Sequence, residues 1–186
     1  ATDTFVRANA NPLSNPMSDG ISTWTNNPGA FNDVQINANL CIGTTSNAGA
    51  RVLSPVFTGQ HSASVTLQST TEYWGPCVRM QSTGDASCYA LITNASNTTL
   101  AFYKVIDTGT IANVQLGSSI TVSTLVAGDV IKLTATGTST VTLNAYVNGL
   151  FVGTTSDSVS PYTGGQPGFW TATSNGSMAG FSAADF

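Results

Sequence analysis

Charged side chains are scarce in this chain of 186 residues. It has five Lys and Arg, nine Asp and Glu and one His, so charged residues make up 8% of the sequence, where about a quarter is typical. Enzymes take most of their proton-transfer groups from these residue types. No two acidic residues lie close enough in the sequence to suggest a catalytic pair, and the single Glu is Glu72. The sequence therefore favours a protein that binds, coats or displays over one that catalyses.

Basic residues and long apolar runs are also lacking. Five scattered basic residues and a formal net charge of −4 do not provide the basic patch that binds a phosphate backbone. No apolar run approaches the roughly 20 residues of a membrane-spanning helix. No charged segment followed by an apolar stretch opens the chain, so we expect no signal peptide in it. We expect neither nucleic acid nor a membrane as a partner.

Cysteine is too scarce for a disulfide scaffold, because there are only three, Cys41, Cys77 and Cys88. Cys77 and Cys88 lie on two β-like runs, and a hairpin would bring them within disulfide reach if they shared a face. The other interpretation is three buried thiols that pack as small apolar groups. We favour the second interpretation and leave the first open.

Ser, Thr, Asn and Gly take the place of charged residues, and apolar and polar residues alternate along most of the chain. Alternation with a period of two predicts strands with one wet face, as at Val34–Asn37, Ser62–Leu67 and Ile131–Ala135. No window keeps apolar residues at helical spacing for three turns. The sequence predicts one all-β domain over residues 1–186, with about a dozen strands in a two-sheet sandwich.

Turn residues predict three hairpins and two irregular segments. The clearest hairpin lies within Val141–Phe151, where Asn148-Gly149 tolerates the positive φ of a type I′ turn. A second hairpin joins Leu100–Val105 to Ile111–Leu116, and a third joins the strands at Cys77 and Cys88. Asn-Pro pairs predict an irregular, loop-rich segment at 9–29, and Pro and Gly predict a long loop at Ser156–Gly168.

The motifs, in their order along the chain, resemble the concanavalin A-like (laminin-G-like) jelly-roll family. Asp3-Thr4-Phe5-Val6-Arg7-Ala8 resembles the opening of these domains, and Ala179–Phe186 is similar to their last strand. The resemblance implies an antiparallel two-sheet jelly-roll sandwich in which the first and last strands pair. The motifs between the two ends are Thr23-Trp24-Thr25, Val78-Arg79-Met80, Cys88-Tyr89-Ala90, Leu100–Val105, Ala127–Leu133, Tyr146–Gly149 and Gly165–Trp170.

The family that the chain resembles includes lectins, carbohydrate-binding modules, phage surface proteins, glycoside hydrolases and polysaccharide lyases. The fold alone does not indicate which of these functions a member has. We expect a non-catalytic, lectin-like module that binds a glycan or polysaccharide on the concave face of one sheet or on the loops at its rim. The main alternative is a structural virion protein, such as a phage capsid decoration or tail protein in a homo-oligomeric assembly. Either would lie outside the cell or on a virion surface.

Catalysis is the weaker alternative. A glycosidase needs two carboxyl groups beside the scissile bond, and Glu72 has no close acidic neighbour in the sequence. Gln60 and His61 superficially resemble a polysaccharide lyase motif, but adjacent residues point to opposite faces of a strand. We therefore expect His61 to be a strand-edge or surface residue and the protein not to be an enzyme.

The ligand-binding candidates are Trp74, Tyr162, Tyr73 and Arg79. Tyr73 and Trp74 are adjacent, so one ring faces in and the other out if both lie on a strand. Tyr162 lies in a predicted loop. Core packing is the other interpretation for these rings. Arg79 lies on an apolar strand, where it binds an Asp or a loop carbonyl in a structural role or grips a group of the ligand.

A structural calcium ion is a further expectation that rests on the resemblance. Asp3 and Asp185 lie near the two ends of the chain, and pairing of the first and last strands brings such ends together. Related sandwiches hold calcium near such positions through carboxylate and backbone oxygens. The other interpretation is that each carboxylate solvates a strand end or caps a turn.

Overall fold

The computed structural model describes residues 1–13, 15–26, 29–68, 73–82, 84–174 and 176–186. All of the regular secondary structure in these residues is β, which confirms the all-β prediction. No helix in this part of the chain is long and apolar enough to cross a membrane. The strands are β1 (Thr2–Asp3), β2 (Thr23–Asn26), β3 (Val34–Asn37), β4 (Leu40–Gly43), β5 (Ala48–Ser54), β6 (His61–Leu67), β7 (Trp74–Met80), β8 (Cys88–Thr93), β9 (Thr99–Asp107), β10 (Ile111–Thr121), β11 (Val130–Thr136), β12 (Val141–Val147), β13 (Leu150–Asp157), β14 (Gln166–Thr171) and β15 (Ser177–Asp185).

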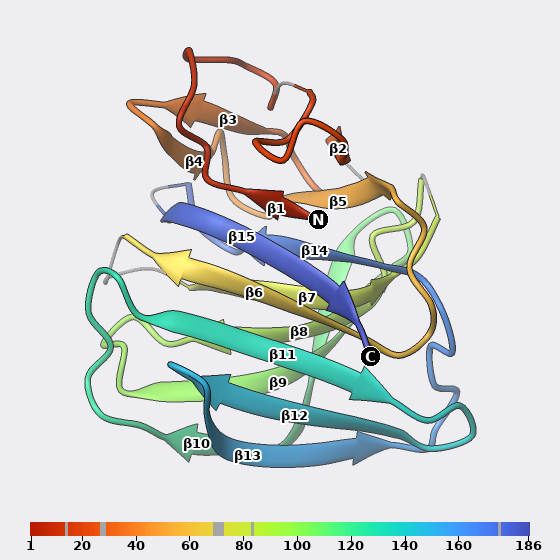
Figure 1. Ribbon diagram of the computed structural model, residues 1–186. Coiled ribbons are helices and arrows are strands. Elements are labelled where there is room, and N and C mark those ends of the chain that lie inside the picture. The colour runs from red at the N-terminus through yellow and green to blue at the C-terminus, as the bar shows by residue number, and fades with distance from the viewer. Residues whose placement is uncertain (14, 27–28, 69–72, 83, 175) are drawn as a thin grey trace.

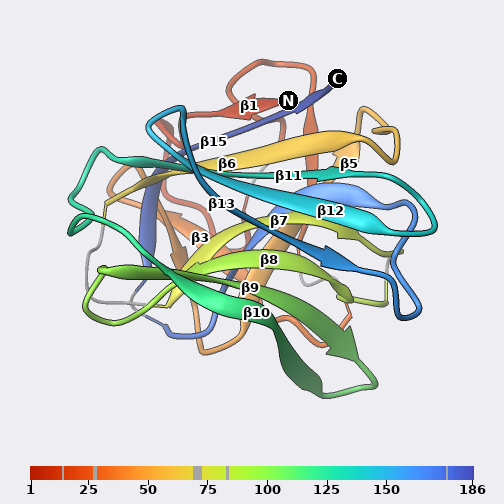
Figure 2. The same ribbon diagram turned by 90° about the horizontal axis from the view of Figure 1, so that it is seen from below.

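The strands form two sheets that stack face to face. Sheet A has the order β13-β12-β11-β6-β15-β4-β3, with β1 also paired to β15, and sheet B has the order β10-β9-β8-β7-β14-β5-β2. Sheet A lies in front of sheet B in Figure 1, and the view from below in Figure 2 shows the two layers. Neighbouring strands in both sheets are antiparallel, which confirms the predicted two-sheet sandwich.

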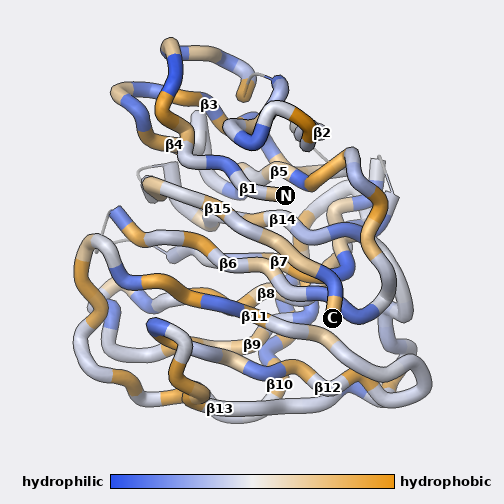
Figure 3. Tube along the Cα trace, viewed as in Figure 1, coloured by the Kyte–Doolittle hydropathy of each residue, from blue (hydrophilic) through white to orange (hydrophobic). Residues whose placement is uncertain are grey.

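Alternating side chains build the core between the sheets. In β6, buried residues alternate with partly exposed ones along the whole strand, and β12 repeats the pattern over most of its length. Figure 3 shows hydrophobic residues interspersed with hydrophilic ones along the strands instead of gathered in one run. Trp24, Phe169 and Phe181 meet in the core, with the Trp24 ring centroid 5.3 Å from that of Phe169 and 4.8 Å from that of Phe181. The alternation thus buries one face of each of these strands.

The three predicted hairpins are present. Asn148 has a φ of 50° and Gly149 a φ of 81°, as a type I′ turn between β12 and β13 requires. β9 pairs with β10, and β7 pairs with β8 with Cys77 opposite Ala90. All three thiols are free and buried.

The two ends of the chain meet in sheet A. Thr2 lies opposite Ser182 and Asp3 opposite Phe181, which confirms the implied pairing of first and last strands. The segment between β1 and β2 has no other strand in its described residues, apart from an isolated bridge from Ala10 to Ile36. Side chains hold part of it, since the Asn15 amide exchanges hydrogen bonds of 2.6 and 3.1 Å with the Trp24 backbone.

Candidate functional site

The outer face of sheet B is the concave face. β7, β8 and β9 arch in Figure 2 with their hollow side away from sheet A. Along β7, β8 and β14 this face is apolar, and Cys77, Ala90 and Ile92 are all buried. The ring of Phe31 stacks on Trp170 at 6.0 Å with the planes 7° apart. This face is therefore largely filled by a second apolar cluster.

Phe31 belongs to the β2–β3 connection, which polar contacts hold against sheet B. The backbone N–H groups of Ala30 and Ala86 both donate to the Asp107 carboxylate, at 2.7 and 2.9 Å. Burial raises the pKa of Asp107, but the hydrogen bonds from Ala86, Ala30 and Gly109 outweigh it and leave the pKa below its usual range. A charged carboxylate thus ties this connection to the end of β9.

The outer face of sheet A is open and polar. Five residues lie opposite one another on five neighbouring strands, β15, β6, β11, β12 and β13. Because neighbouring strands lie about 4.8 Å apart, these residues form a row of side chains at strand spacing across the face. We call this line the platform row; it consists of Ser182, Ser64, Lys132, Tyr146 and Phe151.

The next row on this face adds neutral hydrogen-bonding groups. Ser62, Thr134, Asn144 and Thr154 lie opposite one another on β6, β11, β12 and β13. The amide of Asn144 donates to the Thr134 hydroxyl at 3.4 Å. This face therefore offers hydroxyl and amide groups beside the platform row.

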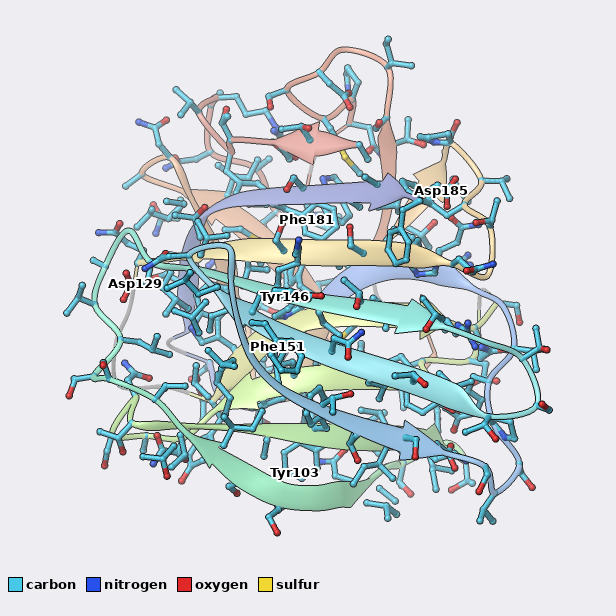
Figure 4. The ribbon with its side chains drawn as sticks, turned by 60° about the horizontal axis from the view of Figure 1, so that its bottom comes forward. Tyr103, Asp129, Tyr146, Phe151, Phe181 and Asp185 are labelled. Atoms are coloured by element: carbon cyan, nitrogen blue, oxygen red, sulfur yellow. The ribbon has the colours of Figure 1, made fainter. Side chains whose placement is uncertain are left out.

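An aromatic pair stands at the β12–β13 end of the platform row. The rings of Tyr146 and Phe151 make an edge contact at 5.8 Å, and Phe151 is 57% exposed. Figure 4 labels both residues, next to each other on the near face. The Lys132 Nζ lies 4.5 Å from the centre of the Tyr146 ring, so it occupies one face of Tyr146 while Phe151 stays open to solvent.

A shallow hollow of about 330 Å³ lies beside the aromatic pair. It is lined by Lys132, Thr134, Thr136, Asn144, Tyr146 and Phe186. The hollow thus combines two aromatic rings, three neutral polar side chains and one cation.

Sequence reasoning missed this site, although a signal for it was present. A two-residue turn at Asn148-Gly149 puts Val147 opposite Leu150, so Tyr146 must face Phe151. No comparable two-residue turn fixes the register between β11 and β12. The sequence therefore does not predict that Lys132 lies beside Tyr146.

Trp74 lies in the core, 1% exposed. The prediction that its ring is available to a ligand is wrong. Trp74 and Val78 both point from β7 toward sheet A and pack in the core between the sheets. The adjacent Tyr73 lies just before β7 and is 45% exposed. Of the two adjacent rings, Tyr73 is the one that faces solvent.

Arg79 is fully buried, so the prediction that it grips a ligand is also wrong. Its guanidinium donates to the carbonyl oxygens of Gly59, Tyr162 and Gly137, with nearest distances of 2.5, 2.7 and 2.7 Å. These carbonyls belong to three loops at one end of the sandwich. Arg79 therefore has the structural role, in which it binds loop carbonyls. Burial lowers the pKa of Arg79.

Tyr162 lies in the predicted loop between β13 and β14, but it is half-buried. Its hydroxyl donates to the Val105 carbonyl at 3.0 Å, and its ring contacts Tyr89 and Lys104. The core-packing interpretation therefore holds for part of this ring, because the loop folds back and the ring packs against the core.

The candidate calcium site at Asp3 and Asp185 does not fit the structure. Asp3 is buried, and its oxygens accept hydrogen bonds from the Arg7 guanidinium, the Phe5 N–H and the Trp24 indole. Asp185 caps Thr58 at 2.9 Å and lies four residues beyond the partner of Asp3 on β15, a separation of about 13 Å. The described residues contain no group of three or more His, Cys, Asp and Glu that could hold a metal ion.

His61 is buried, not a surface residue as the sequence suggested. Its Nδ1 lies 2.7 Å from the Thr58 carbonyl and its Nε2 accepts from the Arg79 N–H at 3.1 Å. These contacts fix the neutral ring with the proton on Nδ1. Burial lowers the pKa of His61.

The acidic residues are used for local structure. Of the eight Asp residues, seven accept hydrogen bonds through their carboxylates. Asp157, for example, accepts from Tyr89 and Lys104, both at 2.8 Å. Glu72, the remaining acid, lies outside the described residues.

Known structures share the fold at low sequence identity. The carbohydrate-binding module CBM66 from Bacillus subtilis matches with a TM-score of 0.61 and 13% identity over 85% of this chain and 92% of that chain. The β-agarase B from Zobellia galactanivorans matches with a TM-score of 0.60 and 8% identity over 100% and 92%. A legume lectin-like domain from Entamoeba histolytica matches with a TM-score of 0.54 and 7% identity over 89% and 90%.

No family model matches the chain, and no curated protein matches its sequence. The likeness to solved structures therefore bears on the arrangement of the strands alone. Together with the two stacked antiparallel sheets and the paired first and last strands, it shows that the chain has the concanavalin A-like jelly-roll fold.

Proposed function

We propose that this chain is a non-catalytic carbohydrate-binding module whose ligand lies across the outer face of sheet A. The platform row is the observation that carries the proposal. It sets an exposed aromatic ring and a line of hydroxyl groups at strand spacing on a face with one charged side chain among its paired outward residues. A polysaccharide repeats on a similar scale and presents both C–H faces and hydroxyl groups.

Each part of the row has a use in this role. The exposed Phe151 ring offers an apolar surface for the C–H face of a sugar. Ser64 and Ser182, whose hydroxyl oxygens lie 2.7 Å apart, offer donors and acceptors to sugar hydroxyls. The open face contrasts with the filled concave face, which is one of the two places, with the loops at the rim, that the sequence suggested for the ligand.

The comparisons support carbohydrate as the ligand, and the acidic residues support binding over hydrolysis. Neighbours of this fold include a carbohydrate-binding module and a lectin-like domain as well as an agarase. A glycosidase needs a carboxylate pair free to act on the scissile bond, and seven of the eight Asp carboxylates accept local hydrogen bonds. Because polysaccharides lie mainly outside cells, we also propose an extracellular location for this protein.

Binding to immobilised polysaccharides tests the proposal. We expect the wild-type protein to bind at least one of laminarin, agarose and alginate, and Phe151→Ala to weaken that binding about ten-fold, because a stacking ring is lost. Tyr73→Ala and Tyr103→Ala are the matched controls, one at the start of β7 and one on the outer face of sheet B, and both should bind as the wild type does. No binding to any polymer, or an unchanged Phe151→Ala variant, would overturn the proposal.

A second candidate function is self-association in a structural assembly, and one observation favours it. β10 is the outermost strand of sheet B, runs for 11 residues and carries neither charge nor Pro. Natural edge strands are usually protected by charge, Pro or bulges, and here the protection is one bulge between Leu116 and Ile120. Antiparallel pairing of two copies about Val114 would bring Asn113 opposite Gln115 without charge repulsion.

Light scattering after size exclusion distinguishes this candidate. Assembly through β10 predicts a concentration-dependent dimer that Val114→Lys abolishes and Phe151→Ala leaves intact. A monomer at all concentrations would remove this candidate, together with the virion role, for which the named neighbours give no support.

A further inference from the structure

We propose that the ligand is an anionic polysaccharide, and that Lys132 binds its acidic group, a uronate carboxylate or a sulfate ester. The inference rests on the proposed function of the outer face of sheet A and names the class of ligand that this face takes. The chain has five Lys and Arg side chains, all of which the structure describes.

Four of the five cations are engaged in holding the fold. Arg7 pairs with Asp3, and Arg79 with three loop carbonyls. Arg51 donates to the Gln81 carbonyl at 2.8 Å. Lys104 pairs with Asp157 and also donates to the Val159 and Ser160 carbonyls.

Lys132 is different. No described residue forms an ion pair or a hydrogen bond with its ammonium group, whose single recorded contact is the face of the Tyr146 ring. That contact orients the side chain along the platform row. Three donors of one ammonium group are therefore left for a ligand, in a chain that uses its other cations internally.

The surroundings of Lys132 on this face are neutral. Its partners across the strands are Ser64 and Tyr146, and its outward neighbours on β11 are Val130 and Thr134. The acidic residue just before β11 is Asp129, whose carboxylate accepts from the Val126 N–H and the Asn148 amide, both at 2.8 Å. Lys132 thus makes a local positive site on a protein with a net charge of −4.

The hollow beside Lys132 has the chemistry for one acidic sugar unit. An anionic group at Lys132 would find the Thr134 hydroxyl and the Asn144 amide on the next row, and these line the same hollow of about 330 Å³. The rings of Tyr146 and Phe186 form apolar walls. A charge-assisted hydrogen bond is about twice as strong as a neutral one, so the cation would decide between acidic and neutral polymers.

Affinity measurements with matched polymers test the inference. The probes are alginate for a carboxylate, carrageenan for a sulfate ester, and laminarin and agarose as neutral polymers. We expect the wild-type protein to bind an acidic polymer more tightly than a neutral one. Lys132→Gln should lower affinity for the acidic polymer about ten-fold and affinity for a neutral polymer by a clearly smaller factor, whereas Lys132→Arg should retain most of the affinity for the acidic polymer.

A matched control separates a local charge from the overall charge. Asn113→Asp changes the net charge by the same amount as Lys132→Gln, at an exposed position on β10 of sheet B, and should leave binding unchanged. Acidic binding should also weaken with added salt, less steeply in Lys132→Gln than in the wild type.

The outcomes distinguish this inference from the proposed function. Binding to neutral polymers that depends on Phe151, without preference for acidic ones, would overturn the inference and leave the proposed function standing. Equal loss in Lys132→Gln and Asn113→Asp would also overturn it. Absence of binding to all four polymers would overturn the proposed function and the inference together.

Discussion

The two outer faces of this sandwich have opposite characters. The outer face of sheet B carries Cys77, Ala90 and Ile92 beneath the stacked rings of Phe31 and Trp170, and all are buried. The outer face of sheet A carries hydroxyl and amide side chains, one cation and an exposed aromatic ring. The same fold thus presents one filled face and one open face.

The difference shows how a loop can fill one outer face of a sandwich and leave the other open. β7, β8 and β14 are buried along their whole lengths, because the core covers their inner faces and the second apolar cluster fills their outer ones. A ligand would have to displace packed side chains to reach these three strands, at the cost of lost apolar burial. Binding on sheet A requires no such displacement.

The largest expected effect comes from neutralising one cation in each sheet. Arg79→Gln should lower the free energy of unfolding by about 4 kcal/mol, because it leaves carbonyls of three loops without a buried donor. Lys132→Gln should change it by less than about 0.5 kcal/mol, as an exposed substitution does. Arg79→Lys should fall between wild type and Arg79→Gln, because it keeps the charge but not the planar fork. Equal effects at both positions in urea unfolding would contradict the contrast between a buried and an exposed cation.

The second expectation compares the same substitution on the two faces. Phe31→Ala should cost about 3 kcal/mol of stability by removing a buried ring while leaving glycan binding unchanged. Phe151→Ala should cost less than about 0.5 kcal/mol and weaken glycan binding. Urea unfolding and polysaccharide affinity measured on both variants check this crossed pattern. A stable Phe31→Ala variant that gained binding on sheet B would refute our assignment of the faces.

The third expectation concerns pH and His61, which links β6 of sheet A to β7 of sheet B. Burial lowers the pKa of His61 in the folded state below its unfolded value of about 6.5. Below about pH 6.5 the imidazole of the unfolded chain binds a proton that the folded chain does not bind. The free energy of unfolding is therefore highest above about pH 6.5 and decreases as the pH falls below it. The loss by pH 5.5 should reach at most about 1.4 kcal/mol.

His61→Gln, which retains an acceptor for the Arg79 N–H, is the control for this window. Chemical unfolding at pH 7.5 and 5.5 should show a smaller pH dependence in the variant than in the wild type. Identical dependence in the two proteins would assign the acid sensitivity to other groups.

The smallest expected effect is on thiol reactivity. Burial raises the pKa values of Cys41 and Cys77, so the native protein should react with a thiol reagent at pH 8 only slowly. Phe31→Ala should speed the reaction of Cys77 and Cys88, which share its apolar cluster, and leave Cys41 in sheet A slow. Mass spectrometry of the labelled peptides measures this, and equal acceleration at all three would indicate global unfolding instead.

Much of the strand pattern could be predicted from the sequence, but the site could not. Val34–Asn37 and the turn at Asn148-Gly149 appear where their local patterns indicated. Trp74 is a candidate because one of two adjacent rings on a strand faces out, and Tyr162 because it lies in a loop, yet packing decided both. A buried Arg79 requires hydrogen-bond acceptors, and carbonyl oxygens of three loops supply them. No sequence pattern indicates that these loops meet at Arg79.

By itself, the sequence determined that much of the chain forms strands in which polar and apolar residues alternate, and that Tyr146 meets Phe151 across a two-residue turn. These are local matters of period and turn geometry. Only the tertiary structure decided which outer face stays open, since Phe31 reaches Trp170 from a distant part of the chain. Only the register of five strands brought Lys132 into line with the aromatic pair, because side chains far apart in sequence become neighbours through strand pairing alone.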